Sequence, residues 1–163
     1  MERLRQKLHI SDDLSRATLA EFFGTFFLLW GGNSIAAQLI LGRRKFDDWN
    51  GVNVGWGIVL IMAVQMTIRI SGAHLNPAVS FFLLTQRKIG VVRCILFIVA
   101  QIIGAYVGAL LCFIVYYDAI MDFGNGTLYV TGPYATANIF STYPQPYLTT
   151  PIALVDQVIH QLT

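Results

Sequence analysis

Charged residues are scarce in this chain: Asp, Glu, Lys and Arg make up 12% of its 163 residues, whereas hydrophobic residues make up 55%. A soluble domain carries about 25% charged residues, and the mean hydropathy of +0.59 is too high for a soluble domain of this length. The scarcity of charge therefore indicates a protein whose solvent is the lipid bilayer. The formal net charge of +2 is also too small to suggest a nucleic-acid partner.

Cysteine is almost absent as well. Cys94 and Cys112 both lie within one apolar stretch, where a thiol behaves as a small hydrophobic side chain. Their spacing and neighbours suggest no metal site, and they define no redox compartment. We therefore expect neither a metal nor a cofactor.

Apolar residues gather in four runs, and a spanning helix needs about 20 such residues. The runs cover residues 17–41, 54–68, 89–117 and 151–163. The first three predict spanning helices, the second of which we expect to begin near Asn53. The first run is no signal peptide, because a polar stretch of sixteen residues precedes it and it is too long for a signal's apolar core.

Lysine and arginine favour one side of the predicted spans. They precede the first span and flank the segment between the second and third spans, whereas residues 118–150 contain none. The positive-inside rule then places the N-terminus in the cytoplasm, although Arg43, Arg44 and Lys45 would lie outside. In the long outer segment, Asn125-Gly126-Thr127 is a pattern that accepts N-glycosylation.

The segment between the second and third spans is apolar but too short to cross a membrane. Asn76 can cap a helix, and Pro77 suits the first helical position because its missing N–H is unpaired there anyway. A helix from Pro77 to about Gln86 would rise about 15 Å, half of a hydrocarbon core about 30 Å thick. Irregular backbone before it is tolerated at membrane depth only where protein buries it or water wets it. Asn76-Pro77-Ala78 therefore predicts the turn of a re-entrant half-helix beside a water-filled path.

Periodicity alone also allows a cytoplasmic loop over residues 70–88 that carries a short surface helix. A resemblance favours the half-helix. The matching run is Ser71-Gly72-Ala73-His74-Leu75-Asn76-Pro77-Ala78-Val79. It resembles the first signature of the major intrinsic proteins, the aquaporins and aquaglyceroporins. Further matches follow in family order at residues 20–25, 101–105 and 140–144. The last of them, with Trp56 and the length of residues 118–150, resembles the glycerol-conducting branch.

The resemblance implies an all-α membrane protein, an aquaporin-like helical bundle that holds the first inverted repeat only. It would contain three spanning helices, one re-entrant half-helix and the start of a fourth span. We expect residues 1–16 to form a cytoplasmic segment, 17–159 a partial aquaporin-like transmembrane domain and 160–163 a short tail. Family members carry a second Asn-Pro-Ala half-helix followed by an arginine, and this sequence has neither. We therefore expect a truncated isoform or a fragment, which cannot conduct alone.

The same resemblance implies which residues contact a permeating solute. The Asn76 amide would donate a hydrogen bond to a passing water or glycerol, and the backbone carbonyls of Gly72, Ala73 and His74 would accept hydrogen bonds from it. Trp56 corresponds to a filter tryptophan whose ring packs against the carbons of glycerol. Because Trp is enriched at membrane interfaces, Trp56 could instead belong to an interfacial belt.

Four residues are expected to support this loop. Glu21 is a charge inside a span and is therefore a functional candidate. It resembles a glutamate that braces the loop by accepting backbone N–H bonds, and the alternative is a polar anchor near the interface. Gln157 falls at the position of the family's second bracing glutamate, and Pro77 and Ala78 complete the turn. None of these residues predicts catalysis.

Three other features leave alternatives open. Gly104 and Gly108 form a Gly-x-x-x-Gly pattern that lets helices approach closely, either within one protomer or between protomers. Asp118 and Asp122 could hold a divalent ion in a membrane-embedded lipid enzyme, although charges just beyond a span are usually solvated. Arg69 departs from the family pattern and could narrow or charge the cytoplasmic vestibule.

The expected function is passive passage of water, glycerol and similar small uncharged solutes, and not enzymatic catalysis. An alternative is a non-conducting isoform that associates with full-length channels and modifies their assembly or trafficking. The expected partners are the lipid bilayer, these solutes, and either further copies or full-length relatives, because family members are typically tetramers. The expected location is the plasma membrane, as a multi-pass protein.

Overall fold

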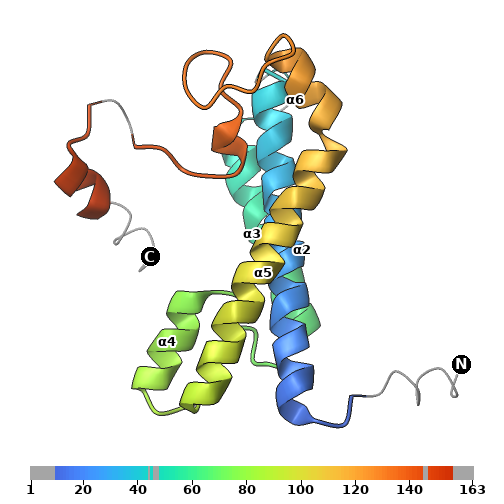
Figure 1. Ribbon diagram of the computed structural model, residues 1–163, viewed down its shortest axis with the longest axis vertical. Helices are drawn as coiled ribbons and strands as arrows, with labels where there is room; N and C mark the ends of the chain where they lie inside the picture. Colours follow the sequence, from blue (N-terminus) through green and yellow to red (C-terminus); the bar gives the residue numbers. More distant parts are fainter. Residues whose placement is uncertain (1–9, 44, 46–47, 145–146, 156–163) are drawn as a thin grey trace, which may run out of the picture.

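The computed structural model describes residues 10–43, 45, 48–144 and 147–155, and its regular elements over these residues are all helical. The elements are α2 (Asp13–Leu41), α3 (Trp49–Thr67), α4 (Pro77–Thr85), α5 (Val91–Val115), α6 (Tyr117–Phe123) and the 3-10 helix η1 (Ala137–Ile139). Figure 1 shows α2, α3 and α5 running along the long axis of the molecule, with α4 beside the first turns of α5. The predicted all-α class is confirmed.

Helices α2, α3 and α5 are long and apolar enough to cross a membrane, which confirms the three predicted spans. Their outer faces expose large apolar side chains, as lipid-facing helices do. On α3, for example, Val54 and Ile61 are each 62% exposed. Helix α3 begins at Trp49 and not near Asn53, because the Asp48 side chain caps it by accepting the backbone N–H of Gly51, in the first turn, at 2.8 Å.

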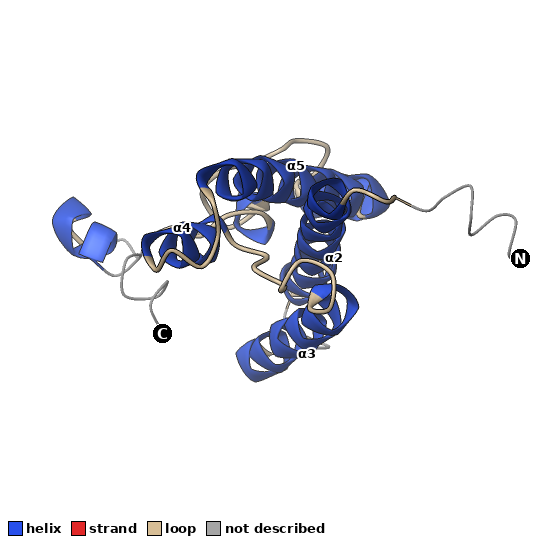
Figure 2. Ribbon diagram, turned by 90° about the horizontal axis from the view of Figure 1, so that it is seen from below, coloured by secondary structure: helices blue, strands red, loops and turns tan. Residues whose placement is uncertain are grey.

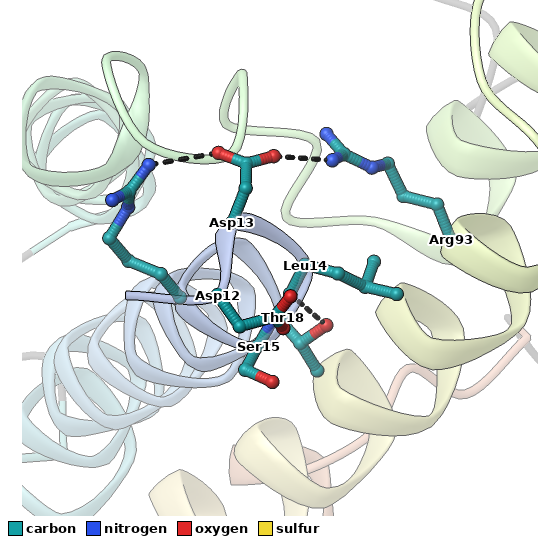
Figure 3. A network of polar contacts seen from close by, with 7 residues as sticks. Asp12, Asp13, Leu14, Ser15, Thr18 and Arg93 are labelled. Atoms are coloured by element: carbon teal, nitrogen blue, oxygen red, sulfur yellow. Dashed lines mark hydrogen bonds and ion pairs between the residues drawn. The ribbon is translucent and has the colours of Figure 1, made fainter. Parts of the chain in front are cut away.

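Helix α2 begins at Asp13, before its apolar run, because the Asp12 carboxylate caps it by accepting the Ser15 N–H at 2.7 Å. Hydrogen bonds from the Ser15 side chain and backbone hold the pKa of Asp12 below its ordinary value. Asp13 pairs with Arg93 of α5 at 2.6 Å and with Arg16 at 2.9 Å (Figure 3). These contacts join the start of α2 to the start of α5.

Two glycines let α5 approach α2 closely. A Cβ atom added at Gly104 would lie 2.4 Å from the carbonyl oxygen of Phe22, and one at Gly108 would lie 2.5 Å from that of Phe26. Only glycine leaves room for such contact between two backbones. The Gly-x-x-x-Gly pattern therefore acts within the protomer. Figure 2 shows the result, with α2 packed between α5 and α3.

The chain after α5 folds back onto the bundle. Ile120 of α6 and Ile139 of η1 are buried in a cluster with Ala37 of α2 and Cys112 of α5. Cys112 therefore serves as a small apolar side chain. Neither α6 nor η1 is predicted from the sequence. Residues 150–155 are helical, as expected for the start of the fourth run.

Candidate functional site

The predicted half-helix is present as α4, nine residues long from Pro77 to Thr85. The Asn76 side chain caps it, since its Oδ1 atom accepts the Ala78 N–H at 2.8 Å. Pro77 occupies the first turn, where its missing N–H costs nothing. Gln86 ends the helix. The helix rises about 14 Å and can cover only half of a bilayer core.

The backbone that leads into α4 has an unusual conformation. Gly72, Ala73 and Leu75 have positive φ angles of 91°, 54° and 51°. Glycine adopts such angles readily, but for alanine and leucine they are unfavourable. Two such residues within one short loop persist only where their surroundings hold them in place.

The group that holds this loop is Glu21, which lies on α2 and is fully buried. One carboxylate oxygen accepts the backbone N–H of His74 at 2.9 Å, and the other accepts that of Leu75 at 2.7 Å. The Ser71 hydroxyl and the Gln101 amide also donate to it. A carboxylate with four donors is well compensated for its burial. Glu21 therefore connects the loop directly to a spanning helix.

The hydrogen-bond network continues from Glu21 into α4 and α5. The Gln101 amide nitrogen lies 2.8 Å from Glu21 and 3.0 Å from the Ser80 hydroxyl of α4. That hydroxyl lies 3.0 Å from Nδ1 of His74. Thus one polar network, buried among apolar helices, joins α2, the loop, α4 and α5. The His74 side chain is part of this structural network.

The sequence singled out Glu21 but assigned no role to Ser71, Ser80 or Gln101. Gln101 carried the same signal as Glu21, a polar residue inside an apolar run, and such residues usually have a partner in the bundle. The two serines gave no comparable signal, because small hydroxyl side chains are common in membrane helices.

The loop also presents backbone acceptors. Within the described part of the chain, no donor hydrogen-bonds to the carbonyl oxygens of Gly72, Ala73 or His74. A carbonyl at membrane depth must find a donor from water, a solute or another protein segment.

Trp56 lies on α3, away from this loop. Its indole ring packs against Gly32 of α2, where an added Cβ atom would lie 2.3 Å from the ring. The ring borders a cleft between α2, α3 and the segment around η1. The structure therefore does not bring Trp56 together with Asn76; it places the two on different parts of the bundle.

The other candidate residues lie outside the loop network. Arg69 is exposed in the turn after α3, and Asn125 is exposed in the turn after α6. Asp118 and Asp122 are exposed, and the described residues contain no group of three or more side chains suited to a metal ion. Gln157 lies outside the described residues.

Three membrane-length helices, with a half-length helix beside them and an irregular loop held by a buried carboxylate, define an integral membrane protein with a re-entrant half-helix. The family model of the major intrinsic proteins matches residues 9–162, and the chain belongs to this family.

Relatives and solved structures agree with this assignment. The chain is 42% identical over 156 residues to aquaporin-9 of Rattus norvegicus, covering 96% of this chain and 53% of that protein. It is 39% identical over 129 residues to aquaglyceroporin-2 of Rhizophagus irregularis, covering 79% of this chain and 41% of that protein. The X-ray structure of the aquaglyceroporin from Plasmodium falciparum superposes with a TM-score of 0.62 at 29% identity, covering 67% of this chain and 45% of that one. The chain thus spans about half the length of the curated relatives it matches, and it corresponds to an N-terminal half.

Proposed function

We propose that this chain supplies one half of the wall of an aquaglyceroporin-like channel for water, glycerol and similar small uncharged solutes. The observation that carries the proposal is the loop held by Glu21, which presents the carbonyls of Gly72, Ala73 and His74 without a donor from the described residues. A solute hydroxyl that donates to these carbonyls recovers hydrogen bonds that it gives up on leaving water.

The start of α4 supplies the complementary donor. Its N-terminus carries roughly +0.5 charge, which disfavours cations and protons near Asn76 but not neutral hydroxyls. Because Oδ1 of Asn76 accepts from Ala78, the side chain's donor is Nδ2, which would hydrogen-bond the oxygen of a passing solute. We propose that Trp56 contacts the carbon side of glycerol, at a different place along the channel from Asn76.

Membership of a channel family supports transport rather than enzymatic catalysis. We further propose a cytoplasmic N-terminus within residues 1–16, a transmembrane part over 17–159 and a tail at 160–163, in the plasma membrane. The distribution of Lys and Arg supports this topology. The exposed turn at Asn125, within the segment 118–150 that contains no Lys or Arg, is consistent with an outer acceptor for a glycan. Assembly as an oligomer belongs to the same proposal.

A hybrid protein tests the channel function. Residues 1–155 of this chain replace the matching half of rat aquaporin-9, and glycerol uptake and osmotic swelling are measured in vesicles. We expect glycerol and water flux above that of empty vesicles, with loss of most glycerol flux in the hybrid carrying Asn76→Asp, because a carboxylate cannot donate to the solute. A hybrid that folds and inserts but conducts neither solute would contradict the proposal.

An alternative proposal for residues 1–163 is association with full-length channels without conduction. Vesicles that contain only residues 1–163 are expected to swell and take up glycerol no faster than empty vesicles, because one half-helix lines one side of a constriction. Flux clearly above the empty control, abolished by Asn76→Asp, would show instead that copies of this chain close a pore. The alternative role fails if adding the chain changes neither the solute flux through a full-length relative nor the amount of that relative at the cell surface.

A further inference from the structure

A cavity of about 470 Å³ lies beside the C-terminal end of α2, where α2, α6 and the loop after α6 meet. Figure 1 shows this loop, in orange, next to the upper end of α2. Arg43 is the one charged side chain among the described residues that line the cavity, and the others are apolar or aromatic. The principal lining residues are Leu39, Ile40, Arg43, Phe123, Pro133 and Tyr134.

The Arg43 guanidinium is held on the aromatic wall of this cavity. It lies over the ring of Phe123, 5.4 Å from the ring centroid, and such a cation–π contact orients the group. The Phe123 ring meets the Tyr134 ring edge to face, with their centroids 6.3 Å apart. Within the described part of the chain, no carboxylate forms an ion pair with Arg43. A guanidinium offers several N–H donors whose geometry matches the oxygens of a phosphate, and here the protein supplies no anion to receive them.

The loop wall of the cavity has a backbone fixed by hydrogen bonds. The Ala135 N–H donates to the Gly132 carbonyl at 3.1 Å, which closes a turn that contains Tyr134. The Thr136 N–H donates to the Tyr129 carbonyl, also at 3.1 Å. Gly132 has a φ angle of 94°, which glycine adopts readily. The chain itself therefore forms the aromatic wall against which Arg43 is placed.

The position of Arg43 along the chain indicates which anion it meets. Helix α2 is long and apolar enough to span the membrane, and Arg43 lies two residues beyond its last residue, Leu41. This is the level of the lipid headgroups, where basic side chains contact anionic lipid groups. Leu39 and Ile40 line the same cavity from within the span. A cation at headgroup level with apolar side chains below it matches the order of phosphate and acyl chains in a phospholipid.

We propose that this cavity binds the phosphate of a glycerophospholipid in the leaflet that contains the C-terminal end of α2. The Arg43 guanidinium donates hydrogen bonds to the phosphate oxygens, and the glycerol and first acyl carbons pack on Leu39 and Ile40. The bound lipid joins α2 to α6, because the same guanidinium contacts Phe123. The proposal does not depend on conduction of any solute, since this chain alone forms the cavity.

Lipid binding is measured by native mass spectrometry of the full chain, released from detergent micelles, in titrations with phosphatidylglycerol. We expect Arg43→Gln to weaken the affinity of the tightest-bound lipid about tenfold, which corresponds to the loss of a hydrogen bond to a charged group. Arg43→Lys keeps the charge but not the planar array of donors. Its affinity should lie between those of Arg43→Gln and the unchanged protein.

Lys45→Gln is the matched control, because Lys45 is an exposed cation two residues away that does not line the cavity. It should bind phosphatidylglycerol nearly as the unchanged protein does. Circular dichroism confirms that each variant is folded, and Arg43→Lys carries the test if Arg43→Gln is not. The proposal is overturned if folded Arg43 variants bind phosphatidylglycerol unchanged or if Lys45→Gln weakens binding equally.

Two further probes separate a lipid phosphate from other ligands. Diacylglycerol has the acyl chains without the phosphate, so its binding should not depend on Arg43. Inorganic phosphate lacks the acyl chains that pack on Leu39 and Ile40, so it should not displace phosphatidylglycerol at equal concentration. Equal weakening of diacylglycerol binding by Arg43→Gln would show that the phosphate is not what Arg43 binds. Displacement by inorganic phosphate would assign the cavity to a free anion, and either result overturns the proposal.

Discussion

Replacing Glu21 with alanine is expected to lower the free energy of unfolding by about 3–5 kcal/mol, because several buried donors lose their acceptor at once and each costs about 1–3 kcal/mol. The donors include the backbone N–H groups of His74 and Leu75 and the Gln101 amide. Without the carboxylate, the loop with its positive φ angles loses its direct connection to α2. Unfolding by SDS titration in mixed micelles, followed by circular dichroism, measures the loss.

Two variants serve as controls for this experiment. Glu21→Gln keeps one acceptor oxygen, so its loss should be smaller than that of Glu21→Ala. Asp13→Asn removes a carboxylate charge from the same helix, but at an exposed ion pair, where the effect should be small. The bracing role of Glu21 is wrong if Glu21→Ala is no less stable than Asp13→Asn.

The second large effect is expected from Gly104→Ala. The added methyl group would lie 2.4 Å from the carbonyl oxygen of Phe22, and a backbone atom cannot move aside as a side chain can. We expect a loss of about 3 kcal/mol, at the upper end of the usual cost of overpacking, as α5 separates from α2. The same SDS titration measures it.

Gly57→Ala is the matched control, since it is also a helical glycine but has no atom within 4 Å of an added Cβ. It should be neutral or stabilise the chain by up to about 1 kcal/mol, because alanine favours helix more than glycine does. Equal losses in the two variants would mean that the α2–α5 contact is not set by Gly104.

Much of this fold could be predicted because the bilayer restricts the chain so strongly. Three apolar runs predicted three spans, and Asn76 followed by Pro77 predicted the start of α4 at Pro77, where the structure has it. Both inferences rest on local physics, namely the length needed to cross lipid and the chemistry of a helix N-terminus. The start of α3 was misplaced because Asp48, a polar cap, lies outside the apolar run that defined the span.

The remaining features depend on contacts between residues distant along the chain. The partnership of Glu21 with Gln101 requires α2 and α5 to be adjacent, and spacing along the chain cannot show that. Helices α6 and η1 are too short to produce a hydrophobic period, and they are held by tertiary packing of Ile120 and Ile139. Gln101 was given no role, although a polar residue in an apolar run is the same signal that singled out Glu21.

The central claim is that the chain between α3 and α5 enters the membrane and returns to the side from which it came. Spin labels at Arg69→Cys, Val79→Cys and Arg87→Cys, in a chain carrying Cys94→Ala and Cys112→Ala, give the depth of each site by EPR power saturation. Val79 is 41% exposed near the start of α4 and accepts a label. We predict that positions 69 and 87 lie at the interface on one side and that position 79 lies well inside the hydrocarbon core. Labels at 79 and 87 at the same interfacial depth would show a surface helix and contradict the re-entrant half-helix.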